Sequence, residues 1–332
     1  MSKEKDIIAC IQRMIGGAHV SLNDDAYWDD GRRQILSTDM LVEGRHFSLE
    51  YFSAFDLGWK STAVSLSDIA GMGGQPESVL LAIGLPDALS LDWIECFYKG
   101  AAAACQQSGA RIVGGDTVGS PQLVITSTVT GSLPSGHTLG RRVQAQPGDW
   151  IIATGYHGLS ALGLLACQAG DSTETAARKA HLRPQPRVEE GLWLSRHYER
   201  YALMDSSDGL ADALLNMAHA SHQTLIVEAV RIPIHAEIQA YAREHQCVPL
   251  QPALYGGEDF QLVATVPDIL PGLEAFFHIL GRVETSGADA PGAFVEQEGK
   301  LIPLSFEQTY QHFPQLDIPT VFSNPPRQED ES

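Results

Sequence analysis

Four separated acidic segments hold the residue types that could do chemistry in this chain. Each lies where an apolar, β-prone run gives way to a glycine-rich or hydroxyl-rich turn; they read NDDA (23–26), STDMLVEGRHF (37–47), VGGDT (113–117) and DSSDGLADAL (205–214). Carboxylates gathered at strand ends repel one another unless cations lie between them, and hard divalent ions such as Mg²⁺ accept oxygen-only ligation. The pattern predicts a metal-assisted site for phosphate chemistry.

Most of these aspartates, taken singly, are more often turn or capping residues, because Asp is a preferred turn former. Asp68 differs, since it lies in the apolar helical run AVSLSDIAGM (63–72). An unpaired carboxylate there would cost several kcal/mol. We therefore expect Asp68 to have a partner.

Common nucleotide-binding motifs are missing from the sequence: it has no Walker A loop, no GxGxxG fingerprint after a strand and no protein-kinase motif set. An enzyme of this sequence that uses a nucleoside triphosphate must hold phosphates mainly through metal ions and backbone amides. The Gly114-Gly115 pair would let the backbone approach a ligand closely, while Asp116 supplies charge. A lone GGD turn is common, so only the combination of segments is informative.

Composition narrows the class of protein. A chain of 332 residues with 44% hydrophobic and 19% charged residues is typical of about two globular domains. The net charge of −19 argues against binding to nucleic acid or anionic lipid. The sequence contains no run of ~20 apolar residues that would predict a membrane span, and its N-terminus has no signal-peptide pattern. We therefore expect a cytoplasmic protein. The five cysteines are never in a CxxC pair, which favours reduced thiols over zinc or disulfides.

The first half of the chain mixes strands and helices without regular βαβ repetition, which favours an α+β layer. We expect a short strand over 34–37, which ends at the acidic STD segment, and a helix over 57–72. Ser90 caps a predicted helix over 91–108, and Gly109 ends it. Further strands are expected at 78–85, 111–113 and 122–130.

The second half is expected to begin after Pro147-Gly148, which gives domains of residues 1–146 and 147–323. The predicted strands are 150–154, 201–204, 224–230 and 260–266, and the predicted helices are 159–169, 186–198, 209–220 and 236–244. The polar tail, 324–332, is expected to be disordered.

Ordered motifs over about residues 20–315 resemble those of the thiamine-monophosphate kinases. They are STDMLVEGRHF, LGWKSTAVSLSDIAGMGGQP, VGGDT, QPGDWIIATG, HLRPQPRV, DSSDGLADAL and GGEDFQL. That family belongs to the aminoimidazole-ribonucleotide-synthetase-like superfamily of ATP-dependent enzymes. The resemblance implies phosphorylation of thiamine monophosphate by ATP to give thiamine diphosphate. It also implies a homodimer whose N-terminal α+β domains share a β-barrel, with a C-terminal α/β domain closing over the nucleotide.

The resemblance also implies roles for individual residues, with Asp39 and Asp208 as the central catalytic carboxylates. Several magnesium ions would be held by Asp25, Ser37, Thr38, Asp39, Asp68, Asp116, Asp205 and Asp208. ATP would be contacted by Gly115, Asp116, Arg142 and Ser207. Thiamine monophosphate would be contacted by His46, Glu258 and Tyr310.

Purely structural roles for the same residues remain alternatives at this point. His46 could be a structural histidine near a strand end, Glu258 part of a polar turn, and Arg142 a solvated loop residue. Trp59 and Tyr98 are expected to be packing residues.

Three positions depart from the family pattern: Asn23 replaces a glycine, Ser65 an asparagine and Ser206 a leucine. Other superfamily activities, such as a cyclo-ligase or a selenophosphate synthetase, are alternatives, as is a regulator that binds nucleotide or metal without turnover.

Overall fold

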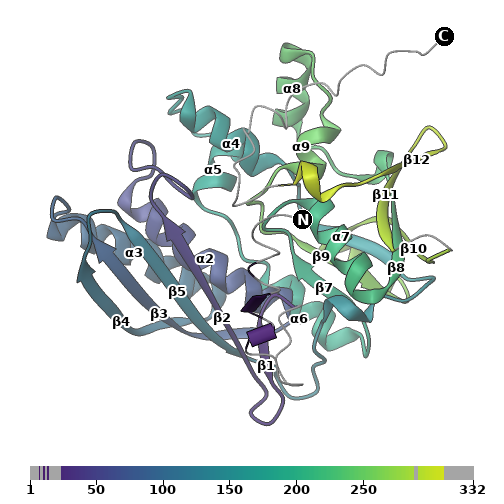
Figure 1. Ribbon diagram of the computed structural model, residues 1–332, viewed down its shortest axis with the longest axis horizontal. Helices are drawn as coiled ribbons and strands as arrows, with labels where there is room; N and C mark the ends of the chain where they lie inside the picture. The colour runs from purple at the N-terminus through teal and green to yellow at the C-terminus, as the bar shows by residue number, and fades with distance from the viewer. Residues whose placement is uncertain (1–6, 8–9, 12, 15–23, 288–290, 310–332) are drawn as a thin grey trace.

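The computed structural model describes residues 7, 10–11, 13–14, 24–287 and 291–309, and within these the chain forms two β-sheets with helices packed against them (Figure 1). The first sheet has five strands in the order β1-β2-β5-β3-β4. Its strands are β1 (Tyr27–Asp29), β2 (Gln34–Val42), β3 (Gln75–Leu85), β4 (Arg111–Gly119) and β5 (Val124–Ser132). β3 and β4 are parallel, and the other neighbours are antiparallel.

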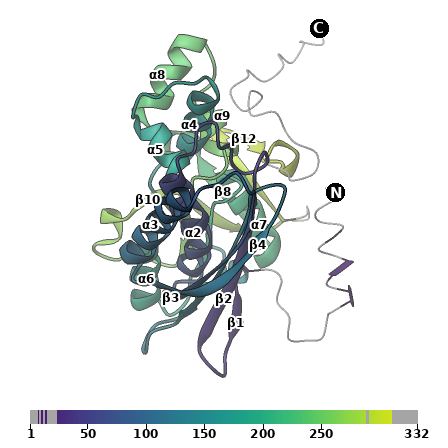
Figure 2. The same ribbon diagram turned by 90° about the vertical axis from the view of Figure 1, so that its left-hand side faces the viewer.

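Two helices, α2 (Ala54–Gly71) and α3 (Leu91–Ser108), cover one face of this sheet (Figure 2). Alternation along β3 buries Leu81 and Ile83 beneath them, whereas Leu80 on the other face is 44% exposed. The predicted helix over 91–108 is confirmed with both of its ends. The Ser90 side chain accepts a hydrogen bond from the Trp93 backbone nitrogen, and Gly109 adopts φ +75°.

Helix α2 is the shared core element of the molecule. All of its residues except Phe55 and Asp68 are buried, because the five-stranded sheet lies on one side and elements of the second sheet on another. A Cβ at Gly58 would lie 1.9 Å from the Phe97 carbonyl oxygen, so α2 and α3 meet backbone to backbone. Only glycine allows that approach.

The second sheet has seven strands in the order β12-β11-β8-β10-β6-β9-β7. They are β6 (Trp150–Thr154), β7 (Ala202–Asp205), β8 (Gln223–Glu228), β9 (Leu262–Val266), β10 (Phe277–Thr285), β11 (Gly292–Gln297) and β12 (Lys300–Pro303). Its helices are α4 (Leu159–Gln168), α5 (Ala176–Leu182), α6 (Val188–His197), α7 (Leu210–Ser221), α8 (Ala236–His245) and α9 (Leu250–Tyr255).

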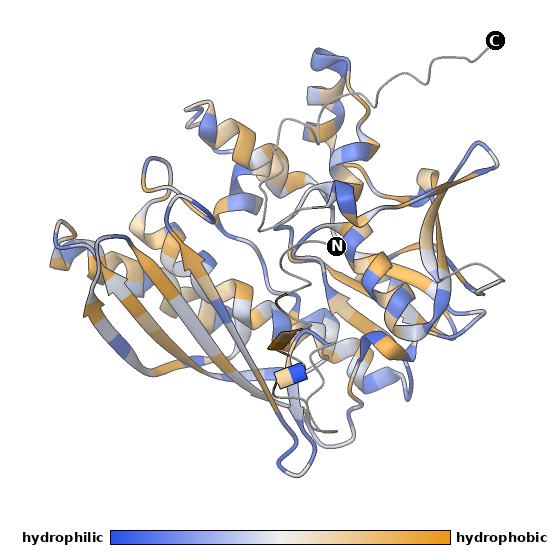
Figure 3. Cartoon of the chain, in the orientation of Figure 1, coloured by the Kyte–Doolittle hydropathy of each residue, from blue (hydrophilic) through white to orange (hydrophobic). Residues whose placement is uncertain are grey.

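Both faces of this second sheet are buried. Ile151 of β6 packs in the apolar cluster that contains Leu214 of α7, and its neighbour Ile152 packs in the cluster that contains Leu194 of α6. Orange, apolar positions accordingly run along the central strands in Figure 3. The arrangement confirms mixed sheets with helices and the expected α/β layering of the second half.

Two expectations about local structure were wrong. The strand predicted over 34–37 continues as β2 to Val42, since all nine of its residues pair with β5. The VGGDT segment is not a turn but the middle of β4, paired with β3. Helices α5 and α9 and strands β1, β10, β11 and β12 were not predicted.

The five-stranded sheet is open in this chain, with β1 and β4 at its edges and no closed barrel among the described residues. Across the described part of the chain, no helix combines the length and apolarity that a membrane crossing needs. The domain boundary after residue 146 stays a prediction. Asn23, Tyr310 and the tail lie outside the described residues.

Candidate active site

Four of the predicted metal ligands converge from four elements. Asp25 precedes β1, Asp39 lies on β2, Asp68 on α2 and Asp205 at the end of β7. The Asp205 backbone nitrogen donates to Asp25 Oδ2 at 3.0 Å, and the carboxyls of Asp39 and Asp68 share a hydrogen bond. We call these four residues the carboxylate cluster.

Hydroxyl groups and one guanidinium contact the carboxylate cluster. Ser65 Oγ donates to Asp39 Oδ2 at 2.7 Å, and Ser67 Oγ donates to Asp205 Oδ2 at 2.6 Å. Ser37 Oγ donates to Asp68. Arg142 Nη2 pairs with Asp25, whose side chain is only 1% exposed. Asp68 therefore has the partner that its apolar surroundings require.

The carboxylate cluster carries more negative charge than its own surroundings offset. Burial raises the pKa of Asp205 to about 8, with the Asp25 charge as a further cause. Burial raises the pKa of Asp68 well above its usual range, and the charges of Asp39, Asp205 and Asp25 add to the shift. Burial also raises the pKa of Asp39 and of Asp25. Burial and mutual repulsion together thus disfavour the ionised form of these carboxyls, and an added positive charge would offset that effect.

The donor set of the carboxylate cluster fits magnesium, because every available ligand is a carboxylate or hydroxyl oxygen. Among the described residues, no three acidic, cysteine or histidine side chains are already arranged as a metal shell. Ser37, Ser65, Ser67 and Arg142 each contact a carboxylate of the cluster.

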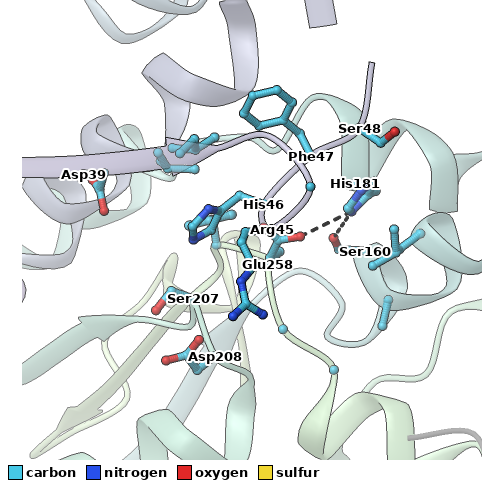
Figure 4. A pocket seen from close by; sticks show the side chains of 18 of the residues that line it. Asp39, Arg45, His46, Phe47, Ser48, Ser160, His181, Ser207, Asp208 and Glu258 are labelled. Atoms are coloured by element: carbon cyan, nitrogen blue, oxygen red, sulfur yellow. Dashed lines mark hydrogen bonds and ion pairs between the residues drawn. The ribbon is translucent and has the colours of Figure 1, made fainter. Parts of the chain in front are cut away.

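A cavity of about 670 Å³ is lined by Asp39 of the carboxylate cluster and, among the other predicted site residues, by His46, Ser207, Asp208 and Glu258. Figure 4 shows Asp39 at one side of this cavity, Ser207 and Asp208 below it, and His46 and Glu258 at its centre. Apolar groups, among them Leu164 and Phe260, complete the wall. The structure therefore brings the catalytic candidates, a nucleotide candidate and two acceptor candidates to a single cavity.

His46 has a structural contact as well as a place in the cavity. Its Nδ1 accepts a hydrogen bond from the Val42 backbone nitrogen at 3.0 Å. An accepting Nδ1 places the ring proton of a neutral imidazole on Nε2. The histidine thus fixes the end of β2, with its ring proton on Nε2.

Gly115 and Asp116 are not brought to the carboxylate cluster within one chain. Asp39 pairs with Ser127, Ser127 with Leu81, and Leu81 with Gly115, so β5 and β3 separate β2 from β4, by about 14 Å at the usual strand spacing. Asp116 also faces away from α2, on the uncovered face of the sheet. Packing explains why residue 115 is a glycine, because a Cβ there would lie 1.8 Å from the Leu81 carbonyl oxygen.

Thr38 shares that uncovered face. Its Oγ1 lies 2.9 Å from Thr128 Oγ1, whereas the neighbouring Ser37 and Asp39 side chains point toward α2. Of the predicted ligands, Thr38 and Asp116 are therefore the two on the side of the sheet away from the carboxylate cluster.

Two of the departures from the family pattern are accommodated by hydrogen bonds. Ser65 bridges Asp39 and the Ser127 carbonyl oxygen, the latter at 3.1 Å. Ser206 Oγ accepts from the Gln261 backbone nitrogen at 3.2 Å. Neither change removes a ligand.

Lys60, His181 and Asp259 were missed by sequence reasoning. The Asp259 carboxylate accepts hydrogen bonds from the backbone nitrogens of Gly158, at 2.5 Å, and Ser160, at 2.8 Å, and so caps α4 from another segment. Lys60 Nζ lies 3.0 Å from Glu258 Oε2 although Lys60 is fully buried. A lysine within a helix of apolar and small residues is the same signal that singled out Asp68. Trp59 is a packing residue, as predicted, with its Nε1 donating to the Pro184 carbonyl oxygen at 2.8 Å.

Comparisons with known proteins agree with this geometry. Residues 22–133 match the family model described as AIR synthase related protein, N-terminal domain, and residues 146–287 match that of the C-terminal domain. A thiamine-monophosphate kinase from Synechococcus elongatus is 35% identical over 294 residues, which cover 85% of this chain and 88% of that protein. A thiamine-monophosphate kinase from Methanospirillum hungatei is 40% identical over 269 residues, covering 81% and 86%.

The chain belongs to the thiamine-monophosphate kinase family.

Solved structures show the same two-domain fold as this kinase-family chain. A structure of AaThiL complexed with AMPPCP and TMP aligns with a TM-score of 0.83 and 28% identity over 93% of this chain and 97% of that one. A hydrogenase maturation protein HypE in complex with ATP aligns with a TM-score of 0.68 at 22% identity, covering 94% and 96%, which shows a shared fold alone.

Proposed function

We propose that this protein transfers the γ-phosphoryl group of ATP to thiamine monophosphate and forms thiamine diphosphate and ADP. The observation that carries the proposal is the single cavity of about 670 Å³, which is lined by Asp39 and Asp208 and also by His46 and Glu258. A phosphoryl donor at the carboxylates and an acceptor at His46 and Glu258 would meet inside it. Family membership and the neighbour bound to AMPPCP and TMP support the same pair of substrates.

Magnesium ions, when bound, would supply positive charge that neutralises the phosphate oxygens and the charge that develops during transfer. Holding those ions is the role proposed for Asp25, Ser37, Thr38, Asp39, Asp68, Asp116, Asp205 and Asp208. Arg142 adds a permanent positive charge beside Asp25, and Ser207 adds a hydroxyl at the cavity wall. These two residues, with Gly115 and Asp116, are the proposed contacts to ATP.

The acceptor needs no strong protein base. Its terminal phosphate is at least partly dianionic near neutral pH, so one of its oxygens can attack the γ-phosphorus in line while the bond to the β-phosphate oxygen breaks. His46 donates from Nε2, and Glu258 accepts, which would orient the acceptor. The chain contributes positioning and charge, the two terms that dominate phosphoryl transfer.

The active unit is proposed to be a homodimer whose five-stranded sheets close into one barrel. β1 pairs with β2 only at Gln34, Ile35 and Leu36, so the rest of β2 forms one open edge, and β4 forms the other. Met40 and Val118 on the uncovered face are 57% and 56% exposed. Joining β4 of one copy to β2 of the other, twice, would remove both edges and bury this face.

That pairing would also explain the position of Asp116. On β4 of one copy, Asp116 would come beside Thr38 and Asp39 on β2 of the other, although Asp116 is far from both of them within a chain. A site built from both copies thus reconciles the family roles of Gly115 and Asp116 with their distance from the carboxylate cluster.

The deciding assay is formation of thiamine diphosphate from thiamine monophosphate, ATP and Mg²⁺, followed by chromatography with ADP measured in parallel. Stoichiometric thiamine diphosphate and ADP are expected. ATP consumption only with the substrates of a cyclo-ligase or selenophosphate synthetase would support those alternatives instead. Nucleotide binding without any turnover would support a regulatory protein.

A further inference from the structure

Lys60 is a fully buried lysine outside the carboxylate cluster. Its side chain is 0% exposed; Nζ lies 3.0 Å from Glu258 Oε2 and 5.2 Å from the centre of the Phe52 ring. Removal of an ammonium group from water is costly unless an opposite charge compensates it. The pairing with Glu258, 198 residues away in the sequence, is the contact that makes the burial of Lys60 tolerable.

Glu258 is held on several sides. Its backbone adopts φ +65°, a left-handed conformation that residues other than glycine rarely take, and its nitrogen donates to the Ser207 carbonyl oxygen at 2.6 Å. His181 Nδ1 of α5 lies 3.5 Å from the same Oε2 that Lys60 contacts (Figure 4). Such strain persists where the surroundings fix it, which is typical of functional positions.

The imidazole of His181 does not compete with Lys60 as a second cation. Burial, followed by the charges of Lys60 and Arg178, holds the pKa of His181 well below its usual range. Nδ1 also lies 3.2 Å from Ser160 Oγ. Lys60 is therefore the positive charge that balances the Glu258 carboxylate.

The other carboxylate oxygen of Glu258 is left for a ligand. Oε1 makes no hydrogen bond with a described residue, and the Glu258 side chain is 32% exposed in a cavity-lining position. We propose that Lys60 is a positioning residue for the acceptor: it anchors Oε2 of Glu258 so that Oε1 accepts a hydrogen bond from an N–H donor, such as the amino group of a heteroaromatic ring.

The charge balance has a consequence for selectivity. Because Lys60 already neutralises Glu258, this carboxylate recognises the position and direction of the N–H donor. It does not recognise the net positive charge of the acceptor. The inference rests on the proposed function of Glu258 in acceptor binding. Lys60 acts through Glu258 and need not touch the substrate.

A double-mutant cycle tests the inference, with wild-type turnover of thiamine monophosphate measured first. Lys60→Met should raise the KM for thiamine monophosphate on the order of tenfold, the usual effect of losing a charge-assisted contact, and change the KM for ATP by less than about twofold. In a Glu258→Gln background, Lys60→Met should raise the KM for thiamine monophosphate no further. Lys99→Met is the matched control, since Lys99 pairs with Glu95 on an exposed face.

Stability gives a second readout. Glu258→Gln leaves the buried ammonium without a carboxylate and should lower Tm, whereas Lys60→Met/Glu258→Gln removes both charges and should recover most of that loss. If Lys60→Met alone does not fold, acceptor binding is compared between Glu258→Gln and the double variant, which should be equal.

The outcomes separate the two proposals. Wild-type protein that does not phosphorylate thiamine monophosphate overturns the proposed function. Normal wild-type turnover with additive effects of the two substitutions, or with equal increases in both KM values, overturns the role of Lys60 and leaves the proposed function standing.

Discussion

Asp25 Oδ2 accepts a hydrogen bond from the backbone nitrogen of Asp205 at 3.0 Å, and this contact joins segments 180 residues apart. Asp25 precedes the five-stranded sheet, whereas Asp205 ends a strand of the seven-stranded sheet. The carboxylate cluster is therefore assembled at the junction of the two sheets and exists only when both are folded.

Removal of one charge from the carboxylate cluster should stabilise the protein and destroy its activity. Asp68→Asn relieves repulsion from Asp39 and Asp205 and is expected to raise Tm in EDTA while lowering kcat by orders of magnitude. Asp208→Asn, at the half-buried cavity wall, should lower kcat similarly without the gain in Tm. Calorimetry and steady-state kinetics on both variants check this. An Asp68→Asn protein with wild-type kcat would show that Asp68 is only structural.

Magnesium should stabilise the folded protein without nucleotide. A cation at one hundred times its Kd adds about 2.7 kcal/mol to the free energy of unfolding, so Tm should rise with Mg²⁺ concentration. The rise should be smaller in Asp68→Asn. Turnover at fixed MgATP should also increase with free Mg²⁺, and saturation with no free excess would contradict a site that holds several metal ions.

Two inactive variants should restore activity to each other if Asp116 serves the second copy. In a dimer of one Asp116→Asn chain and one Asp39→Asn chain, one of the two sites would have both native aspartates. Random mixing after subunit exchange should therefore recover about a quarter of wild-type activity. No recovery, with exchange verified by mass spectrometry, would mean that Asp116 acts within its own chain or not at all.

Stability should fall with acidification through His157. Burial lowers the pKa of His157 to about 3, and neither ring nitrogen has a hydrogen-bond partner among the described residues. Since the ring stays neutral when folded but gains a proton below about pH 6.5 when unfolded, its contribution is complete above that pH and is lost as the pH falls toward 3. From pH 7 to pH 5 the loss is about 2 kcal/mol.

His157→Phe should flatten that part of the stability profile, measured by urea unfolding at each pH. His245→Phe is the control, because His245 lies exposed at the end of α8. Equal slopes for wild-type protein and His157→Phe would show that His157 does not carry the acid sensitivity.

Local sequence signals predicted the elements better than the contacts between them. Ser90 and Gly109 defined α3 because capping is a local effect. The glycine pair in VGGDT was misread as a turn, since the backbone approach that Gly115 permits within the chain is to the neighbouring strand β3. The pairing of Lys60 with Glu258 depends on two segments of the folded chain, and no local pattern contains it.

The near-complete burial of α2 also affects how the protein unfolds. Ala70 of α2 packs in an apolar cluster with Leu194 and Leu262 of the second half, while Phe260 and Leu182 pack in the cluster of the first. If either half unfolds, buried apolar side chains of the other half become exposed to water. Heat or denaturant should therefore melt both sheets in one cooperative transition, and neither half, made as a separate chain, would keep its native core.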